Sequence, residues 1–287
     1  MKKKLLALVL AAGMVASMAA CGNTNSSGSA SVDNKDASAT AENTDSDLAY
    51  VKDKGTLVVG ITDFEPMDYQ DENGNWIGFD ADLASAFAES LGVDVEFVEI
   101  DWDNKILELD GKTIDCVWNG MTINDEVTAA MGVSEPYCTN YQTLVYPADR
   151  AADFEGLTSL EGLSIAVESG SAGEDAAVAL GATTVPVQAQ SNALMEVAAG
   201  TSDAAVIDVL MAAEMTGEGT SYGDLVYDLN LNDMRAEASE FYGVGFRKGS
   251  DLTEAFNNFY KGAYKDGIVL SFAQKYGVQE AIVDPEA

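Results

Sequence analysis

Polar and aromatic residues follow several apolar runs of this chain, at points where buried strands are expected to end. Asn119-Gly120-Met121-Thr122 offers an amide, a hydroxyl and a glycine that lets the backbone approach a ligand closely. Gly170-Ser171-Ala172 opens a predicted helix, whose free N–H groups and dipole favour a carboxylate. Phe64 could cover a ligand with its ring, and Asp208 ends a further apolar run. These residue types could contact a small polar ligand, and any charge buried with it would need a partner.

Each of these residues also has a purely structural interpretation. Phe64 could be a core side chain, and the segment around Gly120 could be a turn that ends in a helix cap from Thr122 or Asn124. Asp208 could cap the helix that follows it. The sequence leaves these alternatives open.

The composition lacks most of the groups that an enzyme would use. The 287 residues contain no histidine, which excludes Ser-His-Asp and Cys-His arrangements and every His-ligated metal site. A formal net charge of -33 argues against a nucleic acid partner, because binding to phosphates requires Lys and Arg. The segment Asp71–Asn75 has a calcium-loop composition, but its glycine falls one place early, and a hairpin turn at Asn73-Gly74 fits better. We therefore expect no metal ion and no cofactor.

Strands and helices alternate along the chain, and their order repeats. Helices are predicted after Asp80 as a cap, with Gly92 as the stop, and over Ala172–Leu180 and Asn192–Ala199. Strands are predicted over Thr56–Ile61, Val93–Ile100, Ile114–Trp118, Leu163–Val167, Val185–Val187 and Ala204–Ile207.

The spacing of glycines carries the repeat. Gly92 and Gly111 are as far apart as Gly181 and Gly200, and in both halves an aspartate (Asp115, Asp203) then opens an apolar strand. Two similar sets of α/β units predict two similar lobes, with ligands at the carboxyl ends of the strands.

Six segments together resemble the polar amino-acid branch of the extracellular solute-binding proteins, over essentially all of residues 48–280. They are GTLVVGITDFEPMDYQDENGNWIGFDADLASAFAESLGV (55–93), TIDCVWNGMTINDE (113–126), VSEPY (133–137), LEGLSIAVESGSAGE (160–174), SDAAVIDVLMA (202–212) and YGVGFRKGSDL (242–252).

The resemblance implies an α/β, two-lobed periplasmic-binding-protein-like fold, with two crossover strands at the hinge. Residues 48–145 and 243–287 would form lobe 1, and residues 146–242 would form lobe 2. The crossovers would be Thr143–Pro147 and Tyr242–Phe246. The chain's end would return to lobe 1 through a helix whose apolar stripe is Leu252, Phe256, Phe259, Tyr260 and Ala263.

By the same resemblance, the protein would be a monomer that closes on an amino acid or a related zwitterion and delivers it to the permease subunits of an ABC importer. Asp208 would pair with the ammonium group of the ligand. The ligand-binding set would be Phe64, Trp102, Asn119, Gly120, Met121, Thr122, Glu168, Ser171, Ala172 and Asp208.

One position departs from the family pattern. Val127 stands where the family has an arginine that grips the carboxylate of the ligand. Either the helix end at Ser171 with Asn119 and nearby amides holds the carboxylate, or another cation such as Lys105 or Arg235 does, or the ligand is not a standard amino acid.

Two other functions remain open from the sequence. Some relatives with this fold are dehydratases that use a carboxylate in the cleft, a place that Glu168 could occupy. A ligand-sensing surface module is the other alternative. We expect a binding protein and not an enzyme.

The N-terminus predicts export and a lipid anchor. Residues 1–20 read as a lipoprotein signal peptide, with three lysines and a short apolar stretch ending at Ala19-Ala20. Cys21 would carry the lipid, and residues 21–47, which are polar and small, would form a disordered tether. The expected location is the outer face of the cell membrane, held through the lipid alone. After export, Cys116 and Cys138 are expected to be separate buried thiols rather than a bridge.

Overall fold

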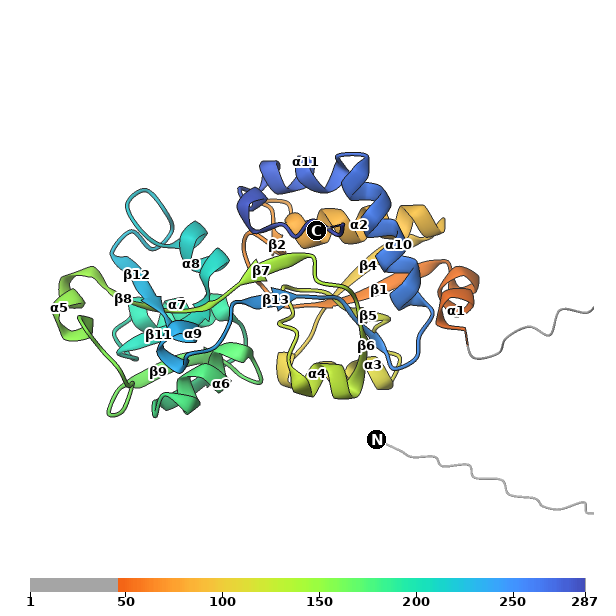
Figure 1. Cartoon of the computed structure of the whole chain (residues 1–287). Coiled ribbons are helices and arrows are strands. Elements are labelled where there is room, and N and C mark those ends of the chain that lie inside the picture. Colours follow the sequence, from red (N-terminus) through yellow and green to blue (C-terminus); the bar gives the residue numbers. More distant parts are fainter. Residues whose placement is uncertain (1–45, 287) are drawn as a thin grey trace, which may run out of the picture. The chain divides into compact units, whose positions relative to one another are not determined.

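The computed structural model describes residues 46–286, which form two α/β lobes, each built on a five-stranded sheet (Figure 1). The predicted signal peptide, Cys21 and residues 22–45 of the predicted tether lie outside the described residues. Ser46 and Asp47, which the sequence assigned to the tether, instead cap and begin helix α1 (Asp47–Lys54). Within residues 46–286, no helix has both the length and the apolar character that crossing a bilayer requires.

The first sheet has the strand order β4-β1-β5-β14-β6. Its three leading strands are parallel, and β14 runs antiparallel between β5 and β6. The strands are β1 (Thr56–Ile61), β4 (Asp94–Glu99), β5 (Cys116–Val117), β6 (Met131–Val133) and β14 (Gly245–Arg247). The helices and hairpin strands of this lobe are β2 (Tyr69–Gln70), β3 (Trp76–Ile77), α2 (Phe79–Leu91), η1 (Trp102–Asn104), α3 (Lys105–Asp110), α4 (Asp125–Ala130), α10 (Leu252–Lys265), α11 (Ile268–Lys275) and η3 (Gln279–Ala281).

The second sheet has the strand order β10-β9-β11-β8-β12. Again three strands are parallel, and β8 runs antiparallel to both of its neighbours. The strands are β8 (Gln142–Pro147), β9 (Ser164–Glu168), β10 (Thr183–Val187), β11 (Ala204–Asp208) and β12 (Leu225–Asn230). The helices are η2 (Ala148–Arg150), α5 (Ala151–Phe154), α6 (Ala172–Ala179), α7 (Gln190–Ala198), α8 (Val209–Met215) and α9 (Leu231–Arg235).

The two sheets confirm the repeat that the sequence predicts. In chain order, the first strand of each parallel set lies in the middle, with the second and third strands on its two sides. The predicted aspartates perform the same task in both lobes. Asp115 accepts a hydrogen bond from the Val58 amide of β1 at 2.9 Å, and Asp203 accepts one from the Ser164 amide of β9 at 3.0 Å. A side chain thus fastens the third strand to the first in each lobe.

Two short antiparallel strands, β7 (Cys138–Asn140) and β13 (Glu240–Tyr242), connect the lobes (Figure 1). The predicted crossover Thr143–Pro147 is wrong, because these residues lie in β8, inside the second sheet. The predicted second crossover is displaced for the same reason, because Gly245 and Phe246 belong to β14 of the first sheet. The predicted lobe boundary at residue 145 consequently cuts through β8.

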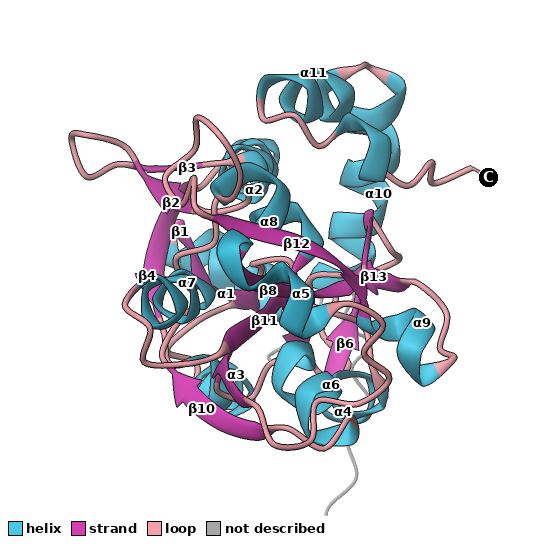
Figure 2. Ribbon diagram, turned by 90° about the vertical axis from the view of Figure 1, so that its left-hand side faces the viewer, coloured by secondary structure: helices cyan, strands magenta, loops and turns pink. Residues whose placement is uncertain are grey.

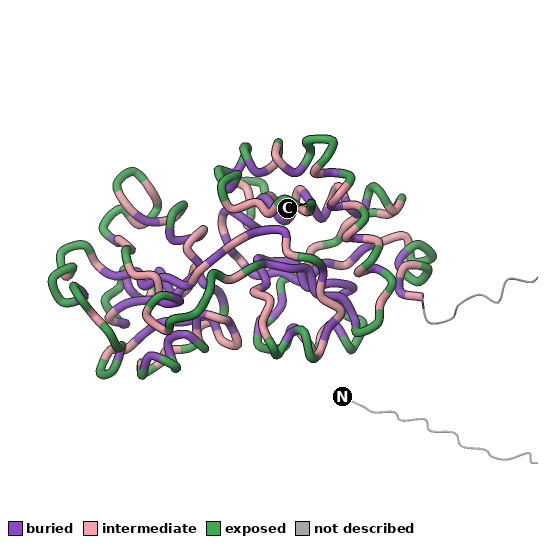
Figure 3. Tube along the Cα trace, in the orientation of Figure 1, coloured by how far each residue is buried: buried purple, intermediate pink, exposed green. Residues whose placement is uncertain are grey.

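The C-terminal helices return to the first lobe, as predicted. In Figure 1, α2, α10 and α11 lie on one side of the first sheet, and α3 and α4 lie on the other. The inward stripe of α10 consists of Leu252, Phe256, Tyr260 and Ala263, all buried. The ring of Phe256 lies 4.9 Å from that of Trp118, which fixes the helix on the sheet. Buried residues follow the strands, and exposed residues follow the outer helices and loops (Figure 3). Figure 2 shows the strands, helices and loops in separate colours.

Local predictions are confirmed with two differences. The hairpin turn at Asn73-Gly74 joins β2 and β3, with Gly74 at φ 80°. Cys116 and Cys138 are both free and buried. The predicted strand Ile114–Trp118 is shorter, since only Cys116–Val117 forms β5. Asp80 does not cap α2: Gly78 occupies that position, and the Asp80 carboxylate points instead to the Gly120 amide.

Candidate ligand-binding site

A cavity lies between the lobes, where the carboxyl ends of the parallel strands face each other. It contains nine of the ten predicted ligand-binding residues. Its volume is only about 20 Å³, enough for a water molecule and far too little for an amino acid. The lining residues are Trp102, Lys105, Asn119, Gly120, Met121, Thr122, Asn124, Val127, Glu168, Gly170, Ser171, Ala172, Gln190 and Asp208.

In the wall from the first lobe, two buried carboxylates hold the segment at the end of β5. The Asn119 amide donates to Asp68 at 2.8 Å and accepts from the Thr62 hydroxyl at 2.8 Å. The Gly120 amide donates to Asp80 at 2.8 Å. The side chain of Asn119, which the sequence predicts to contact the ligand, is therefore occupied by hydrogen bonds within the protein. Its chief role is to hold the shape of the cavity wall.

The wall from the second lobe centres on the start of α6. Ser171 caps this helix by accepting a hydrogen bond from the Glu174 amide at 3.1 Å. Glu174 in turn accepts one from the Gly170 amide at 2.8 Å. Within the described residues, the amides of Ala172 and Gly173 have no hydrogen-bond acceptor. This helix start can therefore still bind an acceptor of a ligand.

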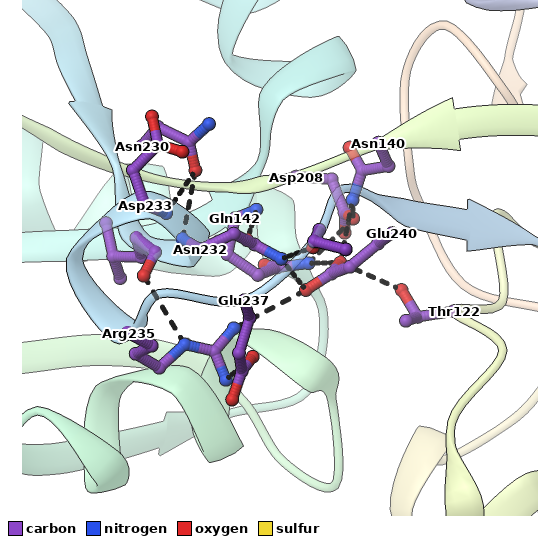
Figure 4. Close-up of polar contacts among 12 residues, drawn as sticks. Thr122, Asn140, Gln142, Asp208, Asn230, Asn232, Asp233, Arg235, Glu237 and Glu240 are labelled. Atoms are coloured by element: carbon purple, nitrogen blue, oxygen red, sulfur yellow. Dashed lines mark hydrogen bonds and ion pairs between the residues drawn. The ribbon is translucent and has the colours of Figure 1, made fainter.

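Asp208, at the end of β11, sits in a dense polar network beside the hinge (Figure 4). It accepts hydrogen bonds from Asn140 and Gln190, from Gln142 at 3.0 Å and from the Tyr242 hydroxyl at 2.8 Å. Burial raises the pKa of Asp208 to about 7, with a further contribution from the negative charge of Glu240, which the hydrogen bonds oppose. Although Asp208 is the residue before α8, its side chain makes no cap.

Glu168, the last residue of β9, is the second carboxylate in the cavity. It is 2% exposed, and its Oε1 atom lacks a hydrogen-bond partner within the described residues. Burial raises the pKa of Glu168 to about 8. An uncompensated buried acceptor of this kind is costly, and a donor supplied by a ligand would remove that cost.

Lys105 faces these carboxylates from the first lobe. Its Nζ atom donates to the Gly170 carbonyl of the second lobe at 2.9 Å and lies 3.4 Å from the Trp102 carbonyl. The same atom lies 5.2 Å from the centre of the Trp102 ring. Burial lowers the pKa of Lys105. Within the described residues, Lys105 is the cation that lines the cavity.

Three further residues that the sequence analysis named, Phe64, Arg235 and Val127, are not placed to pair with a charge of the ligand. Phe64 is fully buried and does not line the cavity; it packs edge-to-face on Tyr242, which matches the core interpretation. Arg235 lies in a neighbouring groove and pairs with Glu237 at 2.8 Å and Glu240 at 3.6 Å. Val127 does line the cavity, so the missing arginine leaves an apolar surface there.

Sequence reasoning missed Gln190. This residue begins α7 and exchanges hydrogen bonds with Asp208, receiving one from the Asp208 amide at 2.8 Å. A usable signal was present, since Gln190 follows the second predicted strand of the second half, where a strand end faces the cleft.

The chain matches the family model described as bacterial extracellular solute-binding proteins, family 3, over residues 57–279. It is 29% identical over 279 residues to the arginine-binding extracellular protein ArtP of Bacillus subtilis (strain 168), covering 96% of this chain and 98% of ArtP. A solved mutant of ArgBP from T. maritima is 32% identical, with a TM-score of 0.73, and covers 80% of this chain and 99% of that one. The solved ancestral amino acid-binding protein AncCDT-1, a precursor of cyclohexadienyl dehydratase, is 34% identical, with a TM-score of 0.71 and coverage of 80% and 99%.

The chain therefore belongs to the bacterial extracellular solute-binding proteins of family 3. The predicted two-lobed fold is confirmed. The comparisons favour a binding protein over the dehydratase alternative, because the family and the relative that covers nearly the whole chain are described by binding.

Proposed function

We propose that this protein captures an amino acid between its two lobes for an ABC importer. The observation that supports this proposal is the charge arrangement of the cavity. Glu168 offers an unpartnered carboxylate oxygen to an ammonium group, Asp208 adds its negative charge, and the Ala172 amide at the start of α6 is open to a carboxylate. The two kinds of group sit in one buried space, as a zwitterionic ligand requires.

The charges of the cavity favour an amino acid with a positively charged side chain. Both carboxyl groups of the cavity have a raised pKa, so each is fully ionised near neutral pH only when a positive group lies beside it. The cavity contains one lysine, so a bound zwitterion would leave one of these two negative charges unbalanced. A second positive group on the ligand would balance it, with the unpartnered Glu168 oxygen as the acceptor. The arginine-binding relative ArtP agrees with this choice.

Binding requires the lobes to open first. A cavity of about 20 Å³ cannot admit an amino acid, so the ligand must enter a wider form and be enclosed afterwards. The connecting strands β7 and β13 are the segments that would bend.

The test is a substitution at Asp208. A thermal-shift screen of the standard amino acids first identifies the ligand, because a tight ligand stabilises only the folded protein. Asp208→Asn keeps the shape of the side chain and removes its charge. We expect binding measured by calorimetry to weaken by about 2–5 kcal/mol, the usual cost of breaking a buried charged pair.

The matched control is Glu218→Gln, which removes one charge from an exposed loop of the same lobe and should bind normally. Wild-type affinity in folded Asp208→Asn would contradict the role of Asp208. An enzyme with this cavity would convert the bound compound. For a binding protein, we expect the ligand to be recovered unchanged after incubation with the protein.

We also propose that the protein is a lipid-anchored monomer that docks on permease subunits at the outer face of the membrane. Family membership supports the extracellular location. The support for the anchor is the Ala19-Ala20-Cys21 sequence that follows the apolar stretch.

A further inference from the structure

The missing arginine raises the question of which group neutralises the ligand's carboxylate. We propose that Lys105, in the first lobe, neutralises the carboxylate of a ligand that lies against the start of α6 in the second lobe. This proposal rests on the proposed function. Lys105 would thus take the place of the family's arginine, whose position Val127 occupies in this chain, from a different helix.

The position of the Lys105 ammonium group supports this assignment. Its Nζ atom lies 2.9 Å from the Gly170 carbonyl, two residues before α6 begins, and Gly170, Ser171 and Ala172 line the same cavity as Lys105. Lys105 is only 4% exposed. An ammonium group has three N–H donors, and two acceptors are found for this one within the described residues. A third donor remains for a ligand.

The two arginines nearest in role to the missing one are committed elsewhere in the described region. Arg235 is held by Glu237 and Glu240 in a neighbouring groove. Arg247 is buried in the first lobe, where it pairs with Asp47 at 3.0 Å and Asp115 at 3.3 Å. Neither lines the cavity.

The surroundings of Lys105 also point to a ligand of defined chemistry. The cavity holds the unpartnered Oε1 atom of Glu168, which is 2% exposed, together with Asp208. A ligand with a carboxylate at the Lys105 end and positive groups at the Glu168 and Asp208 end would pair every charge. Cationic amino acids fit this pattern, and the corresponding amines, which lack the carboxylate, do not.

Lys105 would also connect ligand binding to closure. The lysine belongs to the first lobe, whereas Gly170 and the start of α6 belong to the second. A carboxylate placed between them contacts both lobes and replaces part of the direct contact of Lys105 with the Gly170 carbonyl. Lys105 therefore selects the ligand and positions the lobes around it.

The experiment compares each amino acid that binds in the thermal-shift screen with its decarboxylated amine, for example L-arginine with agmatine. Calorimetry is performed on wild type, Lys105→Met and Lys105→Arg, with Lys265→Met, an exposed lysine of the first lobe, as the control. We expect wild type to prefer the amino acid strongly. Lys105→Met should weaken amino acid binding on the order of 30- to 1,000-fold and amine binding far less, since the amine has no carboxylate to lose its partner. Lys105→Arg should restore part of the preference, and Lys265→Met should behave as wild type.

Other results overturn the proposal in distinguishable ways. Equal weakening of amino acid and amine by Lys105→Met would mean that Lys105 only holds the lobes together. Wild-type protein that binds the amine as tightly as the amino acid would refute a carboxylate contact while leaving the receptor function intact. Failure of every amino acid to bind the wild type would refute the proposed function, and the role of Lys105 with it.

Discussion

At the residue scale, two buried acids, Asp68 and Asp80, lie in the first-lobe wall of the cavity, where they bond to Asn119 and Gly120. Asp68 and Asp80 are both 0% exposed, and each has an Oδ1 atom without a partner among the described residues. Burial raises the pKa of Asp80 to about 7, and burial and the neighbouring Asp80 charge raise the pKa of Asp68 well above its usual value. Two like charges in a dry site cannot both ionise cheaply, so the pair is best satisfied with a shared proton.

This pair predicts a pH dependence of stability. An unfolded aspartate loses its proton near pH 4, whereas folded Asp80 retains it to about pH 7. Between these values the folded state binds more protons, so its free energy of unfolding falls as the pH rises, by up to about 1.4 kcal/mol per pH unit for each such group. Above about pH 7 the Asp80 contribution is flat.

Asp68→Asn should reduce this slope and raise the melting temperature at pH 7. An asparagine carries no charge, can still accept from the Asn119 amide and leaves no buried negative charge beside Asp80. Urea unfolding between pH 5 and pH 8 measures the slope, with exposed Asp53→Asn as the control. An unchanged slope in Asp68→Asn would argue against a shared proton.

The candidate site was largely predictable at this scale because polar residues at strand ends converge in an α/β fold. Position alone could not show which side chains face the cavity. Phe64 and Asn119 both follow parallel strands, yet Phe64 packs in the core, whereas Asn119 lines the cavity with a side chain that is already hydrogen-bonded to Thr62 and Asp68. Lys105 could not be ranked from the sequence, because its contact with Gly170 joins residues of different lobes.

At the scale of elements, the turn after β5 depends on a close approach of three segments. Gly120 has φ 55°, and a Cβ atom there would lie 2.5 Å from the Phe64 ring and 3.1 Å from the Tyr242 ring. The turn therefore brings together the end of β1, the end of β5 and the connecting strand β13. A side chain at this point would push the cavity wall away from the hinge.

Gly120→Ala should consequently destabilise the protein by about 1–3 kcal/mol through overpacking, in addition to the strain of a positive φ. It should also weaken ligand binding. Gly92→Ala is the matched control, because Gly92 has φ 78° with no atom within 4 Å of the added carbon and so tests backbone strain alone. Chemical unfolding and calorimetry give the two quantities. Equal stability losses in the two variants would show that the contact with Phe64 is unimportant.

The elements themselves were mostly predictable, since apolar periodicity and glycine stops mark each strand and helix locally. The crossovers were not. Cys138–Asn140 and Gln142–Pro147 are both extended, and only their partners distinguish a connecting strand from a sheet strand. That choice depends on tertiary pairing, which the local sequence does not encode.

At the scale of the whole molecule, the proposed anchor determines where the protein is found. Cys21→Ser should remove the lipidated residue and release the protein into the medium, because the lipid is the attachment that we propose. Fractionation of cells and medium, followed by immunoblotting, measures the distribution. Asn23→Ser, which keeps Cys21, should remain with the membrane, and membrane retention of Cys21→Ser would contradict the anchor.

The placement of β14 has a consequence for how the chain acquires its structure. The second sheet uses one continuous stretch, from β8 to β12, whereas the first sheet is completed only when β14 enters between β5 and β6. Contacts across such a long sequence separation form slowly, because the loop must close before they stabilise anything. During export from the N-terminus, the second lobe can therefore fold first, and it brings the ends of its own stretch to the hinge. The first lobe stays incomplete until β14 and the C-terminal helices have been added. Until then its apolar strands are exposed to chaperones and proteases.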